Sequence, residues 1–133
     1  MAIDTYSNHQ LSSNIGALNV CFWNIHGQTS KLIGDKFRDP EFFNVLGNSH
    51  IVGFAELHTE SEASLTGFDL IKQKIRKKSH RGPKIAGGLA VFVSDGYSHM
   101  VKLVPNNNKD CIWIKIKKEY LGGTKMFTLL LCI

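Results

Sequence analysis

Residues 18–24 read LNVCFWN and residues 50–56 read HIVGFAE, and these two stretches decide the fold. Each is a short apolar run with β-branched and aromatic residues, long enough for a strand and too short for a helix. Each is expected to lie buried inside a sheet. The segment between them carries helix signals, with Asp39 as N-cap, Pro40 at the first position and Gly47 as the stop. This strand–helix–strand order predicts an α/β fold whose two strands lie close in one sheet.

The remainder of the chain is predicted to be mostly strand. Further strands are expected over residues 68–71, 89–94, 97–104, 111–118 and 125–133. The strand over residues 97–104 is expected to return as the partner of residues 89–94. Residues 111–118 alternate isoleucine with other residue types, which is the pattern of a half-exposed strand. A weaker helical turn is expected over residues 30–37.

Length and composition indicate one globular domain. The chain has 133 residues, of which 43% are hydrophobic and 20% charged, as in ordinary globular proteins. Residues 1–16 are polar and predict a disordered or extended leader before a domain over residues 17–133, with no secretory signal. No apolar run approaches the roughly 18–20 residues that cross a bilayer, so no membrane partner is expected.

The cysteine pattern indicates a reducing compartment. Cys21, Cys111 and Cys132 lie in apolar stretches, and their spacing suits neither a disulfide framework nor a zinc site. We therefore expect buried, inert thiols and an intracellular protein, with the nucleus one candidate location.

The positive charge is concentrated in one stretch. The net charge is +5, and residues 72–84 (KQKIRKKSHRGPK) hold a large share of the Lys and Arg residues. Clustered cations release counterions from a phosphate backbone, which makes DNA a candidate partner. The candidate nucleic-acid-binding residues are Lys74, Arg76, Lys77, Lys78, Arg81 and Lys84. A solvated surface loop is the simpler interpretation. Because such charge is costly to bury, we expect an exposed loop or hairpin whose flanking strands pair.

An amide and a carboxylate end the two deciding strands. Asn24 ends the first and Glu56 the second, so in neighbouring strands they would meet at one edge, where open α/β sheets bind ligands. Their oxygens suit a hard cation such as Mg²⁺, which polarises a phosphoryl oxygen. The alternative is a solvated Glu and an ordinary turn Asn. His26, His58 and His80 lie in loops, where histidine is more often exposed than catalytic.

Four motifs in order resemble the endonuclease/exonuclease/phosphatase superfamily. Residues 18–27 (LNVCFWNIHG) resemble its strand that ends in Asn with Gly soon after, and residues 50–59 (HIVGFAELHT) resemble its strand that ends in Glu. Residues 85–96 (IAGGLAVFVSDG) resemble the Gly-Gly strand of the LINE-type (non-LTR) retrotransposon endonucleases. Residues 128–133 (TLLLCI) resemble the strand that leads into a Tyr-x-Pro motif. Order and intervals match over residues 17–133.

The resemblance implies a fold and an activity. The fold would be the first half of a four-layer α/β sandwich, two β-sheets flanked by helices, truncated. The activity would be Mg²⁺-dependent hydrolysis of DNA, with Glu56 binding Mg²⁺ and Asn24 beside the metal and the scissile phosphate. Ala55 departs from the family, since many relatives place Gln before the Glu, and His26 occupies a variable position. The family's later Asp-x-Asn and Asp-His motifs are absent, so we expect this chain alone to be inactive.

Other interpretations stay open. One is a non-catalytic nucleic-acid-binding remnant that uses the basic stretch, and another is a retroelement fragment without a selected function. A phosphatase or RNA-deadenylase branch of the superfamily is also open. We further expect self-association, because several apolar side chains should lack a covering sheet, namely Leu129, Leu130, Leu131, Ile133, Phe92 and Ile114.

Overall fold

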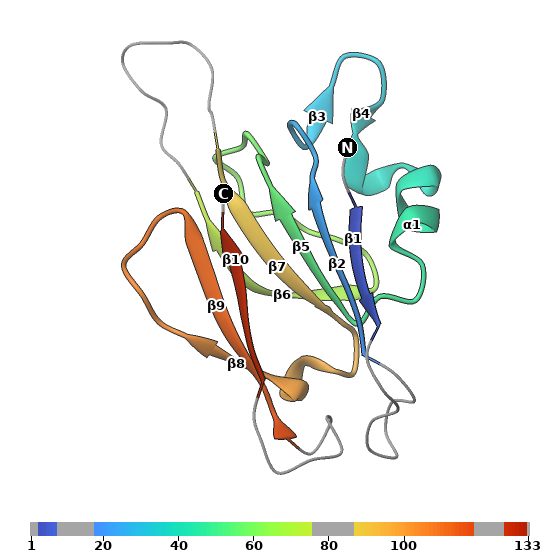
Figure 1. Cartoon of the computed structure of the whole chain (residues 1–133). Helices are drawn as coiled ribbons and strands as arrows, with labels where there is room; N and C mark the ends of the chain where they lie inside the picture. The colour runs from blue at the N-terminus through green and yellow to red at the C-terminus, as the bar shows by residue number, and fades with distance from the viewer. Residues whose placement is uncertain (1–2, 8–17, 76–86, 119–126, 133) are drawn as a thin grey trace.

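Most of the chain that the structure describes is strand (Figure 1). The computed structural model describes residues 3–7, 18–75, 87–118 and 127–132. These residues form a mixed α/β structure with several sheets and a single α-helix. The α/β class predicted from the sequence is therefore confirmed, although the described helix content is low.

The largest sheet has five strands in the order β1-β2-β5-β7-β6. Its members are β1 (Ile3–Ser7), β2 (Asn19–Asn24), β5 (Ile51–Ala55), β7 (Leu89–Ser94) and β6 (Phe68–Lys74). β2 and β5 are parallel neighbours with Asn24 opposite Ala55, as the strand–helix–strand order predicts. The remaining pairs are antiparallel.

β1 lies within the segment that the sequence predicts as a leader. Ile3 pairs with Trp23 and Ser7 with Asn19, so β1 runs antiparallel along β2 up to the residue before Asn24. This pairing satisfies the outer N–H and C=O groups of β2, which would otherwise form an open sheet edge. Residues 3–7 therefore fit the extended alternative predicted for residues 1–16 and not the disordered one, while residues 1–2 and 8–16 lie outside the described part.

A small hairpin follows β2, where a helical turn was expected. β3 (Thr29–Ser30) pairs antiparallel with β4 (Gly34–Asp35), and only the 3-10 helix η1 (Lys36–Arg38) is helical there. The Ser30 hydroxyl accepts the Ile33 N–H at 3.0 Å, and Gly34 adopts a φ of 77° that favours glycine. Local turn chemistry thus outweighs the weak helical pattern over residues 30–37.

Helix α1 (Pro40–Leu46) has the end signals that the sequence predicts. The Asp39 carboxylate accepts the Glu41 N–H at 3.1 Å, and Gly47 ends the helix with a φ of 53°. With η1, the helix covers one face of the five-stranded sheet (Figure 1). The Trp23 ring stacks on Phe42 with centroids 4.8 Å apart.

The opposite face of the five-stranded sheet shares an apolar cluster with a second sheet. This sheet has the order β10-β9-β8 and consists of β8 (Val101–Val104), β9 (Cys111–Ile116) and β10 (Phe127–Cys132). Ile112, Ile114 and Ile116 of β9 point into the shared cluster, so the predicted alternation of β9 is confirmed.

Two expectations about this region are wrong. Residues 97–104 do not pair with β7, because the 3-10 helix η2 (Ser98–Met100) redirects the chain and β8 pairs with β9 instead. Phe92 and Ile114 do not lack cover, since both are buried within the chain, Phe92 under α1 and η1 and Ile114 between the sheets. The side chains of β10, including Leu129 to Leu131, and residue 133 lie outside the described part.

Two cysteines, Cys21 and Cys111, differ in their chemical state. Cys21 is buried, as expected. Cys111 is disulfide-bonded, which contradicts the expectation of inert thiols throughout. Spacing along the chain could not reveal this, because it does not determine which strands become neighbours. Within the described ranges, no helix is long and apolar enough to cross a membrane.

Candidate functional site

Asn24 and Glu56 lie at the same edge of the five-stranded sheet, because β2 and β5 are parallel and end side by side. Asn24 is the last residue of β2, and Glu56 directly follows β5. His26 connects the two side chains. Its backbone N–H donates to the Asn24 amide oxygen at 3.1 Å, and its Nδ1 lies 3.0 Å from Glu56 Oε2. The structure thus brings together the amide and carboxylate that the sequence singles out, and adds an imidazole.

Backbone hydrogen bonds continue the sheet past the ends of both strands. The N–H groups of Ile25, Gly27 and Gln28 donate to the carbonyl oxygens of Ala55, Glu56 and Leu57 at 3.1, 2.6 and 2.8 Å. On the other side, the His58 N–H donates to the Gly87 carbonyl at 2.9 Å, which ties this edge to the start of β7. The candidate site therefore sits on a hydrogen-bonded frame rather than on a loose loop.

Three non-glycine residues at this edge have a left-handed backbone. They are His26, Glu56 and His58, with φ of 50°, 55° and 54°, and the described part of the chain contains no others. Such a residue costs about 1–3 kcal/mol, so together they cost roughly 3–9 kcal/mol. Backbone strain of this kind clusters at catalytic and ligand-binding sites. It marks His26 and His58, which sequence reasoning set aside as ordinary loop histidines.

A close approach of the chain explains one glycine at the site. Gly27 has a φ of 100°, and a Cβ added there would lie 3.5 Å from the His58 Nδ1 atom. A side chain at residue 27 would be strained by this φ and would lie in van der Waals contact with the His58 ring. Gly27 lets the chain leave β2 sharply while its N–H still reaches the Glu56 carbonyl.

The donor set at this edge fits a hydrated Mg²⁺ ion. The Glu56 side chain is 31% exposed, and its contact with His26 uses Oε2. A carboxylate offers about four acceptor positions, so Oε1 can face solvent or a cation. Mg²⁺ commonly takes one or two carboxylates and keeps several waters. Among the described residues, no group of three or more His, Cys, Asp and Glu forms an all-protein metal cage.

One predicted DNA-binding residue makes hydrogen bonds within the chain. Lys74 lies in β6, and its ammonium donates to the Asn106 carbonyl at 3.3 Å, the Asn106 amide oxygen at 2.9 Å and the Asn108 carbonyl at 2.6 Å. Desolvation, together with the charge of Lys72, lowers the pKa of Lys74. Lys74 thus links β6 to the loop before β9, and its role toward DNA stays a prediction.

For the rest of the basic stretch, the structure describes only the two flanking strands. β6 and β7 pair antiparallel on either side of it, as the sequence predicts. Lys72 and Lys74 belong to β6 and not to a loop. The other predicted DNA-binding residues lie outside the described part, namely Arg76, Lys77, Lys78, Arg81 and Lys84.

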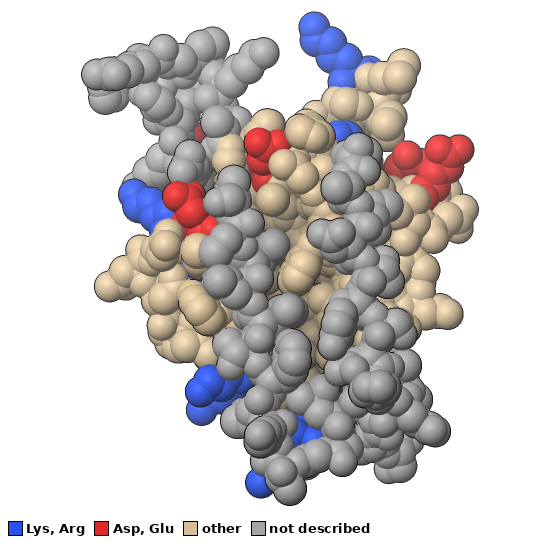
Figure 2. Space-filling view, viewed as in Figure 1, with Lys and Arg blue, Asp and Glu red and all other residues tan. Residues whose placement is uncertain are grey.

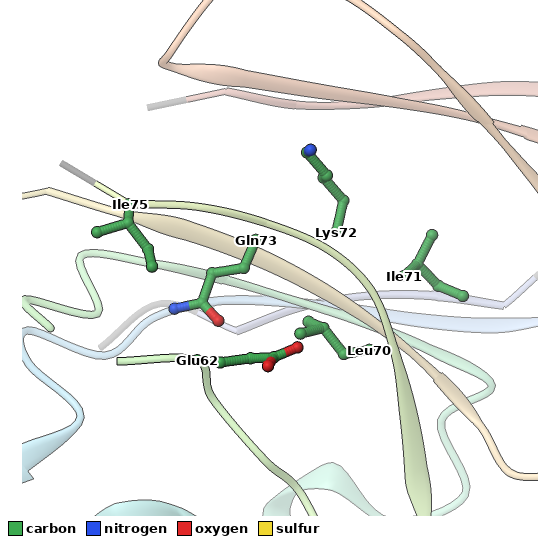
Figure 3. Close-up of a pocket in the computed structure, with 6 residues that line it drawn as sticks. All are labelled: Glu62, Leu70, Ile71, Lys72, Gln73 and Ile75. Atoms are coloured by element: carbon green, nitrogen blue, oxygen red, sulfur yellow. The ribbon is translucent and has the colours of Figure 1, made fainter. Parts of the chain in front are cut away.

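A hollow of about 350 Å³ lies along β6 and is not lined by Asn24 or Glu56 (Figure 3). Figure 3 shows the Gln73 amide on the side of β6 that faces Glu62. This amide accepts the Ala63 N–H at 2.7 Å and donates to the Ser61 carbonyl at 2.9 Å. Gln73 therefore holds the preceding loop against β6 through two hydrogen bonds. We attribute the hollow to this packing of loop and strand and not to a ligand site.

Comparison with known proteins adds no relative. No protein-family model, no curated protein and no solved structure matches this chain.

Proposed function

We propose that this chain carries the metal-binding edge of a Mg²⁺-dependent phosphodiesterase, of the endonuclease/exonuclease/phosphatase type found in LINE-type retrotransposons. The proposal is supported by one observation above all. The left-handed residues His26, Glu56 and His58 gather where the parallel strands β2 and β5 end, together with Asn24. Strained backbone, a half-exposed carboxylate and an amide at a sheet edge are the features expected of a site rather than of a connecting loop.

Each residue has a proposed role. Glu56 binds Mg²⁺ through Oε1, while His26 holds Oε2 and so orients the carboxylate. Asn24 fixes the backbone of His26 and thereby positions Glu56 indirectly. A bound Mg²⁺ would supply electrostatic stabilisation of a phosphoryl oxygen. His26 and Asn24 are thus positioning residues, and Glu56 is the ligand.

The two sheets are proposed to be layers of the sandwich that the resemblance implies. Supporting this, the five-stranded sheet and the β8–β9–β10 sheet bury one apolar cluster between them, and α1 covers the outer face of the former. The parallel β2–β5 pair would then present its ends at the rim of the sandwich, where substrate would approach.

We further propose that the chain binds Mg²⁺ and DNA through this edge. In the family that it resembles, hydrolysis also uses an Asp that helps to activate water and a His that contacts the phosphate. A positioned base contributes about 10²–10⁴ in rate and a preorganised oxyanion donor about 10²–10³. Glu56 and its neighbours alone would therefore hydrolyse DNA roughly 10⁴–10⁷ more slowly than a complete site, if the two contributions are independent.

The test is DNA binding in Mg²⁺ and in EDTA, followed by fluorescence anisotropy of a labelled duplex. We expect Mg²⁺ to strengthen binding by the wild type and to do so less for Glu56→Gln. Glu62→Gln, which alters an exposed carboxylate in a loop, should behave as the wild type. Equal Mg²⁺ responses of wild type and Glu56→Gln would contradict the proposal. Steep salt dependence without any role for Glu56 would favour the non-catalytic nucleic-acid-binding alternative.

A further inference from the structure

The tip of the β3–β4 hairpin exposes large apolar side chains beside a lysine. Leu32 is 94% exposed and Ile33 50% exposed, the two highest values among the large hydrophobic residues of the described part. Lys31 precedes them and is also exposed. A single exposed apolar residue is ordinary, but two adjacent ones at a turn, where Gly, Asn, Asp and Ser are preferred, indicate a surface that meets a partner.

The hairpin is fastened to the candidate site through its base. The Gln28 N–H donates to the carbonyl of Leu57, the residue after Glu56, at 2.8 Å. The Lys36 ammonium donates to the Ile25 carbonyl at 2.5 Å, and the Gln28 amide donates to Asp35 at 3.2 Å. The tip therefore projects from a fixed base whose position relative to Glu56 is set by hydrogen bonds.

The charges along the hairpin favour a polyanion. Residues 28–38 contain Lys31, Lys36 and Arg38 against the single carboxylate of Asp35. Arg38 pairs loosely with Asp35, at 3.8 Å, and the Lys36 ammonium is committed to the Ile25 carbonyl. Lys31 thus provides the positive charge at the tip itself. In Figure 2, a basic side chain projects at the end of the molecule where Figure 1 places β3 and β4.

We propose that Leu32 and Ile33 form an apolar wedge that enters the minor groove of duplex DNA, while Lys31 contacts a flanking phosphate. This inference rests on the proposed function. Proteins that bind the minor groove often insert Leu or Ile between base steps and place cations on the adjacent backbone. A lipid surface could also accept an apolar tip with a lysine. The attachment of the hairpin to an edge proposed to act on phosphodiesters favours DNA.

The reach of the hairpin matches this role. The two residues of β3 separate its base at Gln28 from the turn that carries Lys31, Leu32 and Ile33, which corresponds to roughly 7 Å at about 3.3 Å per residue. The minor groove is about 7.5 Å deep. A tip of this length in the groove, on a base that is hydrogen-bonded to the residue after Glu56, would hold the phosphates at the rim near that edge. The wedge would thus select duplex DNA and set which phosphate faces Glu56.

The first experiment measures the dissociation constant for a labelled duplex at several salt concentrations. We expect the double variant Leu32→Ser/Ile33→Ser to bind about tenfold more weakly, since it loses apolar burial. Its salt dependence should equal that of the wild type. Lys31→Gln should instead reduce the salt slope by about one phosphate contact. Val45→Ser, which removes another exposed apolar residue from α1, is the matched control and should bind as the wild type.

The second experiment identifies what the wedge enters. In Leu32→Trp, we expect quenching of the added tryptophan fluorescence by duplex DNA and no change with vesicles of phosphatidylcholine and phosphatidylserine. A blue shift on the vesicles without a response to DNA would overturn the proposal. Unchanged DNA binding by Leu32→Ser/Ile33→Ser would also overturn the proposal. If the Mg²⁺ response of DNA binding still depended on Glu56 in that case, the proposed function would survive. If the wild type binds no duplex at all, both fail together.

Discussion

Replacing Glu56 by glycine should give a more stable protein than replacing it by alanine, which reverses the usual order. Glu56 has a φ of 55°, where a Cβ atom costs about 1–2 kcal/mol. Glycine avoids this cost but has greater freedom in the unfolded chain, worth about 0.5–1 kcal/mol. Both variants lose the side-chain contact with His26 equally. The difference should therefore favour Glu56→Gly by about 0.5–1 kcal/mol, or roughly 2–4 °C in Tm.

The assay is urea and thermal unfolding of the two variants followed by circular dichroism. Asn44→Gly and Asn44→Ala, at an exposed position within α1, give a matched pair without left-handed backbone, and there alanine should be the more stable. If Glu56→Ala equals or exceeds Glu56→Gly in stability, residue 56 is not held in a strained conformation. The main support for a functional site at this edge would then be lost.

Three further predictions concern the stability of the frame. The His50 Nδ1 accepts the Asn19 N–H at 3.0 Å, and burial lowers the pKa of His50 below 6.5. The unfolded state therefore binds a proton at His50 more readily, so the free energy of unfolding should fall as pH drops below about 6.5. Urea unfolding at pH 7.5 and 5.5 should show this fall for the wild type and a smaller one for His50→Gln. The buried Trp23 Nε1 has no hydrogen-bond partner among the described residues, so Trp23→Phe gives up no hydrogen bond. It should lower the free energy of unfolding by well under the ~3–5 kcal/mol expected for Trp23→Ala, and equal losses of stability in denaturant titrations would contradict this. Asp39→Ala should cost about 1 kcal/mol in the same titrations, and Asp39→Asn much less, because either Asp or Asn can cap the Glu41 N–H.

Local patterns predicted the elements around the site. The apolar runs that became β2 and β5 carry their own strand signal, and Asp39, Pro40 and Gly47 mark both ends of α1. The parallel pairing of β2 and β5 follows from the helix between them. That pairing is sufficient to place Asn24 and Glu56 at one edge, which is why the two ends could be brought together from the sequence alone.

Features that depend on distant partners were not predictable. β8 has the same local pattern whether it pairs with β7 or β9, and η2 decides between them. Lys74 looked like one cation in a basic run, but its acceptors lie more than thirty residues away, at Asn106 and Asn108. The left-handed backbone of His26 and His58 could not be predicted from the sequence, because histidine is only enriched in this conformation and the surrounding hydrogen bonds decide where it occurs.

The most direct test of the proposed site is paramagnetic broadening by Mn²⁺, which accepts the same oxygen ligands as Mg²⁺. In an ¹⁵N-labelled chain, substoichiometric Mn²⁺ should broaden the amide resonances around Asn24, His26, Glu56 and His58 before any others. Excess Mg²⁺ should restore them, and Glu56→Gln should abolish the effect. Broadening that centres elsewhere, or that persists unchanged in Glu56→Gln, would contradict a metal site at the ends of β2 and β5.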